Sequence, residues 1–283
     1  MVPIRGIMKT LEFNGRLVPR IGQGTWHIGD SSATRPAEIA ALRRGIELGM
    51  TLIDTAEMYG AGRSELLVGE AIAPLRHRVQ LVSKVLPSNA SLDGTMKACE
   101  DSLKRLQVET IDLYLLHWRG RHLLRDTVAA FQRLAEQGKI RAWGVSNFDV
   151  DDMEELFAVP GGSSCAANQV LYNPEHRGIE YDLLPWCHRH NVTVMAYSPL
   201  GQAGSLLSSA PICKIAGKHR VAPAQVALAW CLCRPLLAIP KSGSIQHVEE
   251  NAAADGLELD GEDLAAIDSS HPAPKRKRPL AML

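Results

Sequence analysis

The sequence predicts an α/β fold, a single (β/α)8 TIM barrel preceded by an N-terminal β-hairpin. Short apolar runs alternate along the chain with longer segments of helical pattern. The apolar runs are continuous, which is typical of strands buried on both faces of a parallel sheet. Eight strand–helix units within about 260 residues match the size of this barrel. We expect one domain over residues 1–283, with residues 1–10 as an N-terminal extension and residues 271–283 as a tail.

A β-hairpin is predicted before the first barrel strand. Asn14-Gly15 is flanked by Leu11-Glu12-Phe13 and by Arg16-Leu17-Val18, and an Asn-Gly pair between such segments favours a two-residue type I′ turn. Because the hairpin precedes the barrel in the chain, we expect it to plug the bottom of the barrel.

The barrel strands are expected at eight short apolar runs. In chain order these are residues 21–25, 51–54, 79–84, 111–117, 142–146, 165–170, 192–197 and 236–239. Amphipathic segments lie between them, and the first begins with Pro36 and is followed by Gly49, a usual pair of helix start and end signals. The helices specified by this pattern are residues 36–48, 95–106, 127–137, 182–190 and 223–233.

The charge balance excludes several classes of partner. Lys and Arg together number 31, as do Asp and Glu, so nothing favours a nucleic acid or a membrane surface. The chain has no apolar run of about 18 residues, the length that a membrane helix needs. Residues 1–10 lack the apolar core of a secretory signal. We therefore expect a small-molecule partner, with no membrane or nucleic-acid partner.

The six cysteines favour an intracellular setting. They form no C-x-x-C pair and have no histidines at metal-site spacing around them, so they are interpreted as reduced thiols. We expect a cytoplasmic monomer without a bound metal.

Polar or ionisable residues end seven consecutive predicted strands. The active site of a barrel lies at the C-terminal rim of its strands. One such residue often only caps a helix or satisfies a loop, but seven strand ends in a row indicate a site. In strand order these residues are Asp54, Lys84, His117, Ser146 with Asn147, Gln169, Tyr197 with Ser198, and Lys241 with Ser242.

Asp54, Tyr59, Lys84 and His117 together suit proton donation to a carbonyl group. We expect Lys84 and Asp54 to form a buried ion pair, and the cation to lower the pKa of Tyr59 from about 10. A phenol with a lowered pKa can protonate a developing alkoxide at neutral pH, and His117 can polarise the carbonyl oxygen. Lys84 has an alternative role as a Schiff-base lysine, as in barrel aldolases, but the neighbouring carboxylate disfavours it by keeping the amine charged.

Several motifs span almost the whole chain in a fixed order. Asp54-Thr55-Ala56-Glu57-Met58-Tyr59-Gly60 is followed by Ser64-Glu65. The later motifs are Lys84 in LVSK, His117 in LLH, GVSNF at 144–148, NQ at 168–169, AYSPLG at 196–201, IPKS at 239–242, and Glu250-Asn251. With them the chain resembles the aldo-keto reductase family from about Leu11 to Pro279, and in particular its small bacterial members, including methylglyoxal reductases.

The resemblance implies reduction of small aldehydes or ketones with NADPH, which becomes NADP+. It makes Tyr59 the general acid, tuned by Lys84 and Asp54, and makes His117 the residue that orients the substrate. It places Trp26 and Trp118 in the substrate pocket beside Tyr59 and His117. The cofactor residues that it implies are Thr25, Trp26, Asp54, Ser146, Asn147, Gln169, Tyr197, Ser198, Leu200, Ile239, Lys241, Ser242, His247, Glu250 and Asn251.

The chain departs from the family pattern at two places. His247 stands where the family often has Arg to grip the 2′-phosphate, and His is a weaker, pH-dependent cation. Trp118 is followed by Arg119-Gly120 instead of Pro, so the pocket loop differs.

No G-x-G-x-x-G is present, which excludes a Rossmann site. A regulatory, cofactor-sensing barrel of the same family is an alternative that the complete set of four disfavours.

The tail is expected to lie over the surface. Residues 271–283 are rich in Pro, Lys and Arg, and Lys275-Arg276-Lys277-Arg278 is interpreted as a solvated basic run, since it is shorter than the usual basic patch. The short tail predicts an open pocket rather than one shaped for a steroid.

Overall fold

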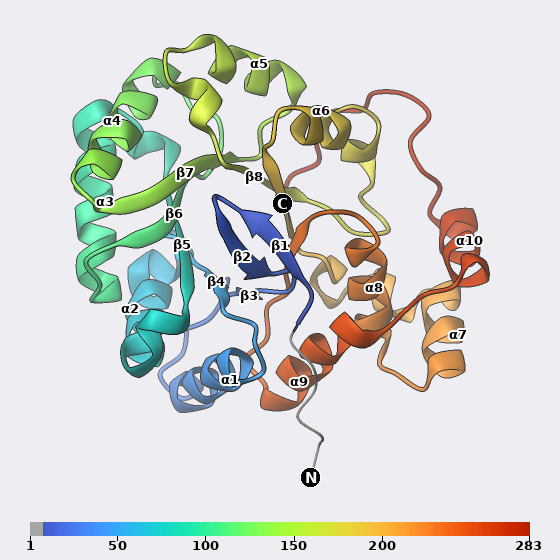
Figure 1. The fold of residues 1–283 in the computed structure, drawn as a ribbon. Coiled ribbons are helices and arrows are strands. Elements are labelled where there is room, and N and C mark those ends of the chain that lie inside the picture. Colours follow the sequence, from blue (N-terminus) through green and yellow to red (C-terminus); the bar gives the residue numbers. More distant parts are fainter. Residues whose placement is uncertain (1–7) are drawn as a thin grey trace.

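The computed structural model describes residues 8–283, in which an eight-stranded parallel sheet follows the chain order from β3 to β10 (Figure 1). The Gly24 amide donates to the Pro240 carbonyl over 2.9 Å, and the Gly22 amide donates to the Ala238 carbonyl over 2.8 Å. These bonds join the first strand to the last and close the barrel. The strands are β3 Gln23–Gly24, β4 Leu52–Asp54, β5 Gln80–Val85, β6 Ile111–Leu116, β7 Ile140–Ser146, β8 Ala167–Leu171, β9 Thr193–Tyr197 and β10 Leu237–Ile239.

Helices surround the sheet in Figure 1. Local signals begin several of them: the Ser91 side chain accepts from the Gly94 amide ahead of α3, and Asp149 forms a capping box with Asp152 ahead of α5. The helices are α1 Arg35–Glu47, α2 Arg63–Ile72, α3 Leu92–Leu106, α4 Leu124–Glu136, α5 Val150–Ala158, α6 Leu183–Arg189, α7 Ala210–His219, α8 Pro223–Leu232, α9 Ile245–Ala253 and α10 Gly261–Ser270. None of these helices is both long and apolar enough to cross a membrane.

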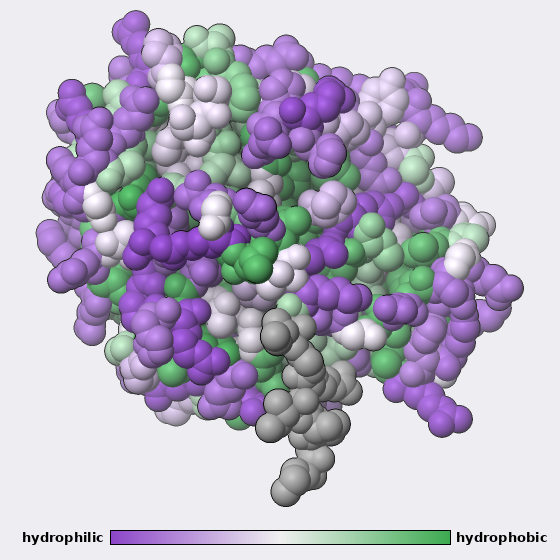
Figure 2. All heavy atoms as spheres, in the orientation of Figure 1, coloured by the Kyte–Doolittle hydropathy of each residue, from purple (hydrophilic) through white to green (hydrophobic). Residues whose placement is uncertain are grey.

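The hairpin predicted at Asn14-Gly15 is present. Strands β1 Thr10–Phe13 and β2 Arg16–Pro19 pair antiparallel, and both turn residues have positive φ, as a type I′ turn requires. Phe13 and Val18 pack inside the barrel against inward-facing strand residues such as Leu113. The hairpin therefore plugs one end of the barrel, as expected, and hydrophilic residues dominate the face of the molecule at this end (Figure 2).

The predicted barrel is confirmed, with strand ends shifted by one or two residues. The five specified helices correspond to α1, α3, α4, α6 and α8, while α2, α5, α7, α9 and α10 were not specified. The predicted extension, residues 1–10, overlaps the hairpin at Thr10, and residues 1–7 lie outside the described part of the chain. The tail runs over the surface, as expected, with Lys275 to Pro279 all exposed, but its last two residues reach the pocket, which was not expected.

Candidate active site

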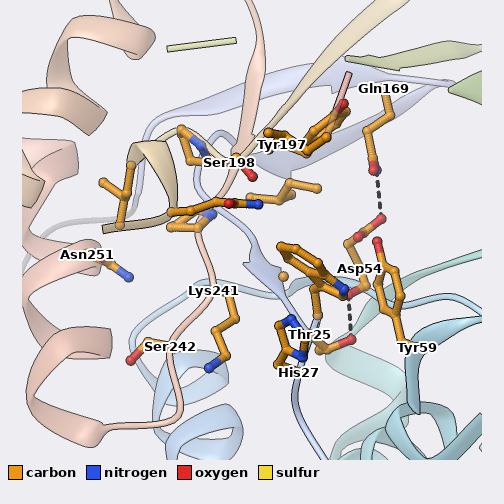
Figure 3. A pocket seen from close by; sticks show the side chains of 18 of the residues that line it. Thr25, His27, Asp54, Tyr59, Gln169, Tyr197, Ser198, Lys241, Ser242 and Asn251 are labelled. Atoms are coloured by element: carbon orange, nitrogen blue, oxygen red, sulfur yellow. Dashed lines mark hydrogen bonds between the residues drawn. The ribbon is translucent and has the colours of Figure 1, made fainter. Parts of the chain in front are cut away.

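A large pocket lies at the carboxyl ends of the barrel strands and encloses about 660 Å³. That volume lies in the usual range for small-molecule sites. Asp54, Ser146 and Tyr197 are the last residues of β4, β7 and β9, so parallel pairing brings their side chains to the same rim. Figure 3 shows Asp54 and Tyr59 at one end of the pocket and Lys241, Ser242 and Asn251 at the other.

The Lys84 ammonium has all three of its protons engaged. Its Nζ donates to Asp54 Oδ2 over 2.7 Å, to the Thr55 carbonyl over 2.9 Å and to the Tyr59 hydroxyl over 3.1 Å. Lys84 and Asp54 are both buried, and these contacts raise the pKa of Lys84 although burial alone would lower it. The expected buried ion pair is therefore present, and an amine held in this way is a poor nucleophile, which disfavours the Schiff-base alternative.

A tight turn presents Tyr59 to this ammonium. Tyr59 begins the 3-10 segment Tyr59–Gly62, in which Gly60 and Ala61 both have positive φ. The segment is fixed from the following helix: the Ser64 hydroxyl donates to Thr25, and buried Glu65 accepts hydrogen bonds from Ser83 and Arg105. The Ser-Glu pair of the sequence motif thus holds the turn that carries the tyrosine.

The expected lowering of the Tyr59 pKa was wrong. Burial raises the pKa of Tyr59 more than the charge of Lys84 lowers it, and the Asp54 carboxylate raises it further. Lys84 still favours the phenolate relative to the same buried site without it. At neutral pH the phenol therefore keeps its proton and lies beside a cation that can stabilise its conjugate base.

His117 is a neutral imidazole in this site. Burial lowers its pKa to about 3, and the charge of Lys84 lowers it further in the same direction. Its ring lies edge-on to Tyr59, with centroids 5.7 Å apart, and is 4.9 Å from the ring of Trp118. Within the described residues its Nδ1 is buried without a hydrogen-bond partner. His117 can therefore act toward a pocket ligand as an uncharged group.

A cluster of amides and hydroxyls lies next to the ion pair. Gln169 Nε2 donates to Asp54 Oδ1 over 2.7 Å, and the Ser146 hydroxyl donates to the Gln169 carbonyl over 2.8 Å. Asn147, which has positive φ, accepts from the Tyr197 hydroxyl over 2.9 Å and donates to Ser146. Predicted residues from β7, β8 and β9 thus form one hydrogen-bonded group beside Asp54.

The other end of the pocket combines one cation with several polar groups. Lys241 and Ser242 follow β10, and His247, Glu250 and buried Asn251 come from α9. The Ser242 hydroxyl is engaged with the backbone of Ser244. Between the two ends lie Ser198, Leu200 and Ile239. Thr25 lines the pocket with a hydroxyl that donates to the Asp54 carbonyl over 2.9 Å.

The pocket brings together nearly every residue singled out from the sequence, including Trp26 and Trp118. Lys84 is the exception: it lies beneath the pocket and reaches it through Tyr59. Sequence reasoning missed other lining residues, among them Gln202 and Leu207 from the segment after β9. Their position after a barrel strand was an available signal.

Met282 and Leu283 also line the pocket, which was not expected of a surface tail, and both stay exposed there, at 49% and 64%. Burial raises the pKa of Tyr197 to about 12, and the backbone of Leu283 partly offsets this, which places the tail against the site. No periodicity or motif in residues 271–283 could have indicated this position, because it depends on long-range packing.

A closed (β/α)8 barrel with a buried Asp–Lys–Tyr cluster beneath a pocket at the carboxyl ends of its strands has the architecture of a barrel enzyme. The chain belongs to the aldo/keto reductase family, whose family model matches residues 20–271. This confirms the resemblance drawn from the motifs.

Curated relatives and solved structures cover nearly all of the chain. It is 52% identical over 281 residues to methylglyoxal reductase YeaE of Escherichia coli, covering 97% of this chain and 99% of that protein. It is 36% identical to a glyoxal reductase of Bacillus subtilis, with 90% of each chain covered. An aldo/keto reductase of Klebsiella pneumoniae solved with NADP and acetate superposes with a TM-score of 0.96 at 50% identity, covering 98% of this chain and 100% of that one. The same scores hold for a Klebsiella pneumoniae structure with NADPH.

Proposed function

We propose that this enzyme reduces small aldehydes and ketones, with methylglyoxal-like and aromatic aldehydes as its best substrates, and that it uses NADPH. The observation that carries the proposal is the threefold engagement of Lys84 with Asp54, Thr55 and Tyr59 at the floor of the pocket. Such a group has a proton to give and a cation to stabilise the product anion, but it offers no nucleophile.

Tyr59 is the general acid of this proposal. NADPH, when bound, supplies a hydride to the carbonyl carbon, and negative charge then develops on the carbonyl oxygen. The Tyr59 hydroxyl gives its proton to that oxygen, and Lys84 stabilises the phenolate that remains. His117, neutral because of burial, can donate a hydrogen bond that orients the carbonyl. Asp54 keeps Lys84 charged and fixed in place.

The polar cluster of β7 to β9 suits the carboxamide of a nicotinamide. Ser146, Asn147 and Gln169 offer donors and acceptors at one place on the rim, and Tyr197 offers an aromatic face beside them. The residues present therefore fit the reactive half of a nicotinamide dinucleotide.

The polar far end suits the adenosine half. Ser198 and Leu200 would hold the phosphate chain, and Glu250 and Asn251 would hold the adenine; all four line the pocket. Lys241 and Ser242 provide a cation and a hydroxyl for a 2′-phosphate, and no acidic residue stands from Lys241 to His247 to accept a free ribose hydroxyl. NADPH is therefore preferred over NADH.

Small substrates are favoured by the walls of the substrate end. Trp26 and Trp118 supply large aromatic surfaces, and Met282 and Leu283 add apolar contacts from the tail. A wall of this kind narrows the pocket, which suits compact carbonyl compounds better than steroids. We further propose a cytoplasmic monomer. The six cysteines are all free, which suits a reducing compartment, and burial raises the pKa of Cys99, Cys165, Cys187 and Cys231 to about 12 each.

A steady-state assay tests the proposal. NADPH oxidation is followed with methylglyoxal, glyoxal, a nitrobenzaldehyde, a steroid ketone and a long prenyl aldehyde, and kcat/KM is compared. Higher values for the small and aromatic aldehydes are expected. A clear preference for the steroid or prenyl compound would contradict the substrate class, and tight NADPH binding without turnover of any carbonyl would favour a cofactor-sensing role instead.

A further inference from the structure

The basic run Lys275 to Arg278 contains one lysine that is fixed to the barrel. Lys277 Nζ lies 3.1 Å from Asp151 Oδ1, in the first turn of α5, and 3.9 Å from Asp182 Oδ2, at the start of α6. The charge of Asp149, the cap of α5, also acts on Lys277. A single cation thus lies among three carboxylates from two helices, and the run is not simply a solvated one.

The tail on either side of Lys277 is held in different ways. Upstream, buried Arg177 donates to the His271 carbonyl and to Asp268, each over 2.6 Å. Downstream, Leu280 packs on the hydrophobic core. Residues 271–283 contain no helix or strand, so their path depends on such side-chain anchors. Between the Arg177 anchor and Leu280, the ion pairs of Lys277 with Asp151 and Asp182 attach the tail to the barrel, and they are the ion pairs found for this stretch among the described residues.

The downstream end of this segment reaches the pocket within a few residues. Met282 and Leu283 line the pocket that also contains Tyr59, His117 and Trp118. Only four residues separate Lys277 from Met282, and Leu280 between them packs on the core, so the two attachments together fix the path by which the tail reaches the pocket. The anchor is exposed, at 46% for the Lys277 side chain and 79% for that of Asp151, and therefore sensitive to salt.

We propose that Lys277 is a positioning residue for substrate selection, whose ion pairs with Asp151 and Asp182 hold residues 280–283 as a wall of the substrate end of the pocket. The inference rests on the proposed function for its substrates, although the clamp itself does not. Releasing the clamp widens the pocket and relaxes the preference for compact aldehydes. Exposed ion pairs contribute little each, so the effect is a change of about two- to fivefold.

The test compares Lys277→Met with the control Lys275→Met. The control also removes one positive charge from the basic run, but Lys275 makes no ion pair among the described residues. Hydrogen exchange of the amides of residues 280–283 reports the clamp without any substrate. The ratio of kcat/KM for 2-naphthaldehyde to that for methylglyoxal reports the wall. Both are measured at about 20 mM and at about 500 mM NaCl, a change that shortens the Debye length about fivefold.

Lys277→Met is expected to raise the exchange rate and the naphthaldehyde ratio about two- to fivefold at low salt. High salt should move the wild type in the same direction and leave Lys277→Met nearly unchanged. Asp151→Asn should give a smaller change in the same direction, and the double variant should be less than additive. Lys275→Met should match the wild type.

Equal exchange in Lys277→Met and Lys275→Met would overturn the clamp. Faster exchange without a change of the kcat/KM ratio would overturn the role in selection, as would an unchanged ratio in Met282→Ala. If the wild type reduced neither aldehyde, the proposed function would fail and selection with it, while the exchange measurement would still decide whether Lys277 holds the tail.

Discussion

Lys84 donates a hydrogen bond to the Tyr59 hydroxyl over 3.1 Å, from a position where its ammonium is fully buried. The Lys84 side chain comes from β5 and the tyrosine from the turn after β4. The two meet because β4 and β5 are parallel neighbours, with Asp54 paired to Val82 in the ladder. This contact connects the barrel's buried charge to the pocket.

Replacing Lys84 with Met should remove activity and destabilise the protein. The substitution leaves Asp54 as a buried carboxylate without its cation, and breaking such a pair costs about 3–5 kcal/mol. It also removes the charge that lowers the pKa of Tyr59. The free energy of unfolding from urea titration and kcat/KM check the two effects. The double variant Asp54→Leu with Lys84→Met should regain much of the stability and none of the activity. A folded, fully active Lys84→Met enzyme would refute the role of Lys84 as the cation that supports Tyr59.

Stability should depend on pH through His117. Its pKa is about 3 in the folded protein and about 6.5 when unfolded, so the unfolded chain takes up the proton first as pH falls. The contribution of His117 to the free energy of unfolding is therefore complete above pH 6.5 and is lost progressively as the pH falls toward 3. The loss is about 2 kcal/mol at pH 5. His117→Gln should flatten the fall in unfolding free energy between pH 7.5 and pH 5, and the exposed His77→Gln should not. The same slope in all three proteins would show that His117 is not a buried neutral base.

Replacing His247 with Arg should tighten NADPH binding and leave NADH binding nearly unchanged. His247 lines the far end of the pocket with Lys241 and Ser242, and arginine offers a permanent charge and a bidentate contact to phosphate. Fluorescence titration gives the dissociation constants of both cofactors for both proteins. Unaltered NADPH affinity would show that His247 does not contact the 2′-phosphate, and equal wild-type affinity for NADH and NADPH would contradict the role of Lys241.

The barrel and most of the pocket residues could be predicted from the sequence. The direction of the Tyr59 pKa shift and the contribution of the tail to the pocket could not. Strand ends could be read because buried parallel strands are continuous apolar runs that stop at polar residues such as Asp54 and Gln169. The sign of the Tyr59 pKa shift could not be read, because it depends on how burial compares with the charge of Lys84. Met282 escaped prediction because its place in the pocket depends on distant anchors such as Asp151.

The central claim is that Tyr59 donates the proton, and single-turnover reduction by Tyr59→Phe tests it most directly. Methylglyoxal is mixed with enzyme carrying NADPH or its 4-deuterated form, so that an isotope effect shows when hydride transfer limits the observed rate. Loss of an acid catalyst lowers the rate by about 10²–10⁴-fold, while NADPH affinity stays as in the wild type and the exposed Tyr181→Phe control keeps full activity. A Tyr59→Phe enzyme that retains more than about a tenth of the wild-type rate, with a clear isotope effect, would show that another group supplies the proton.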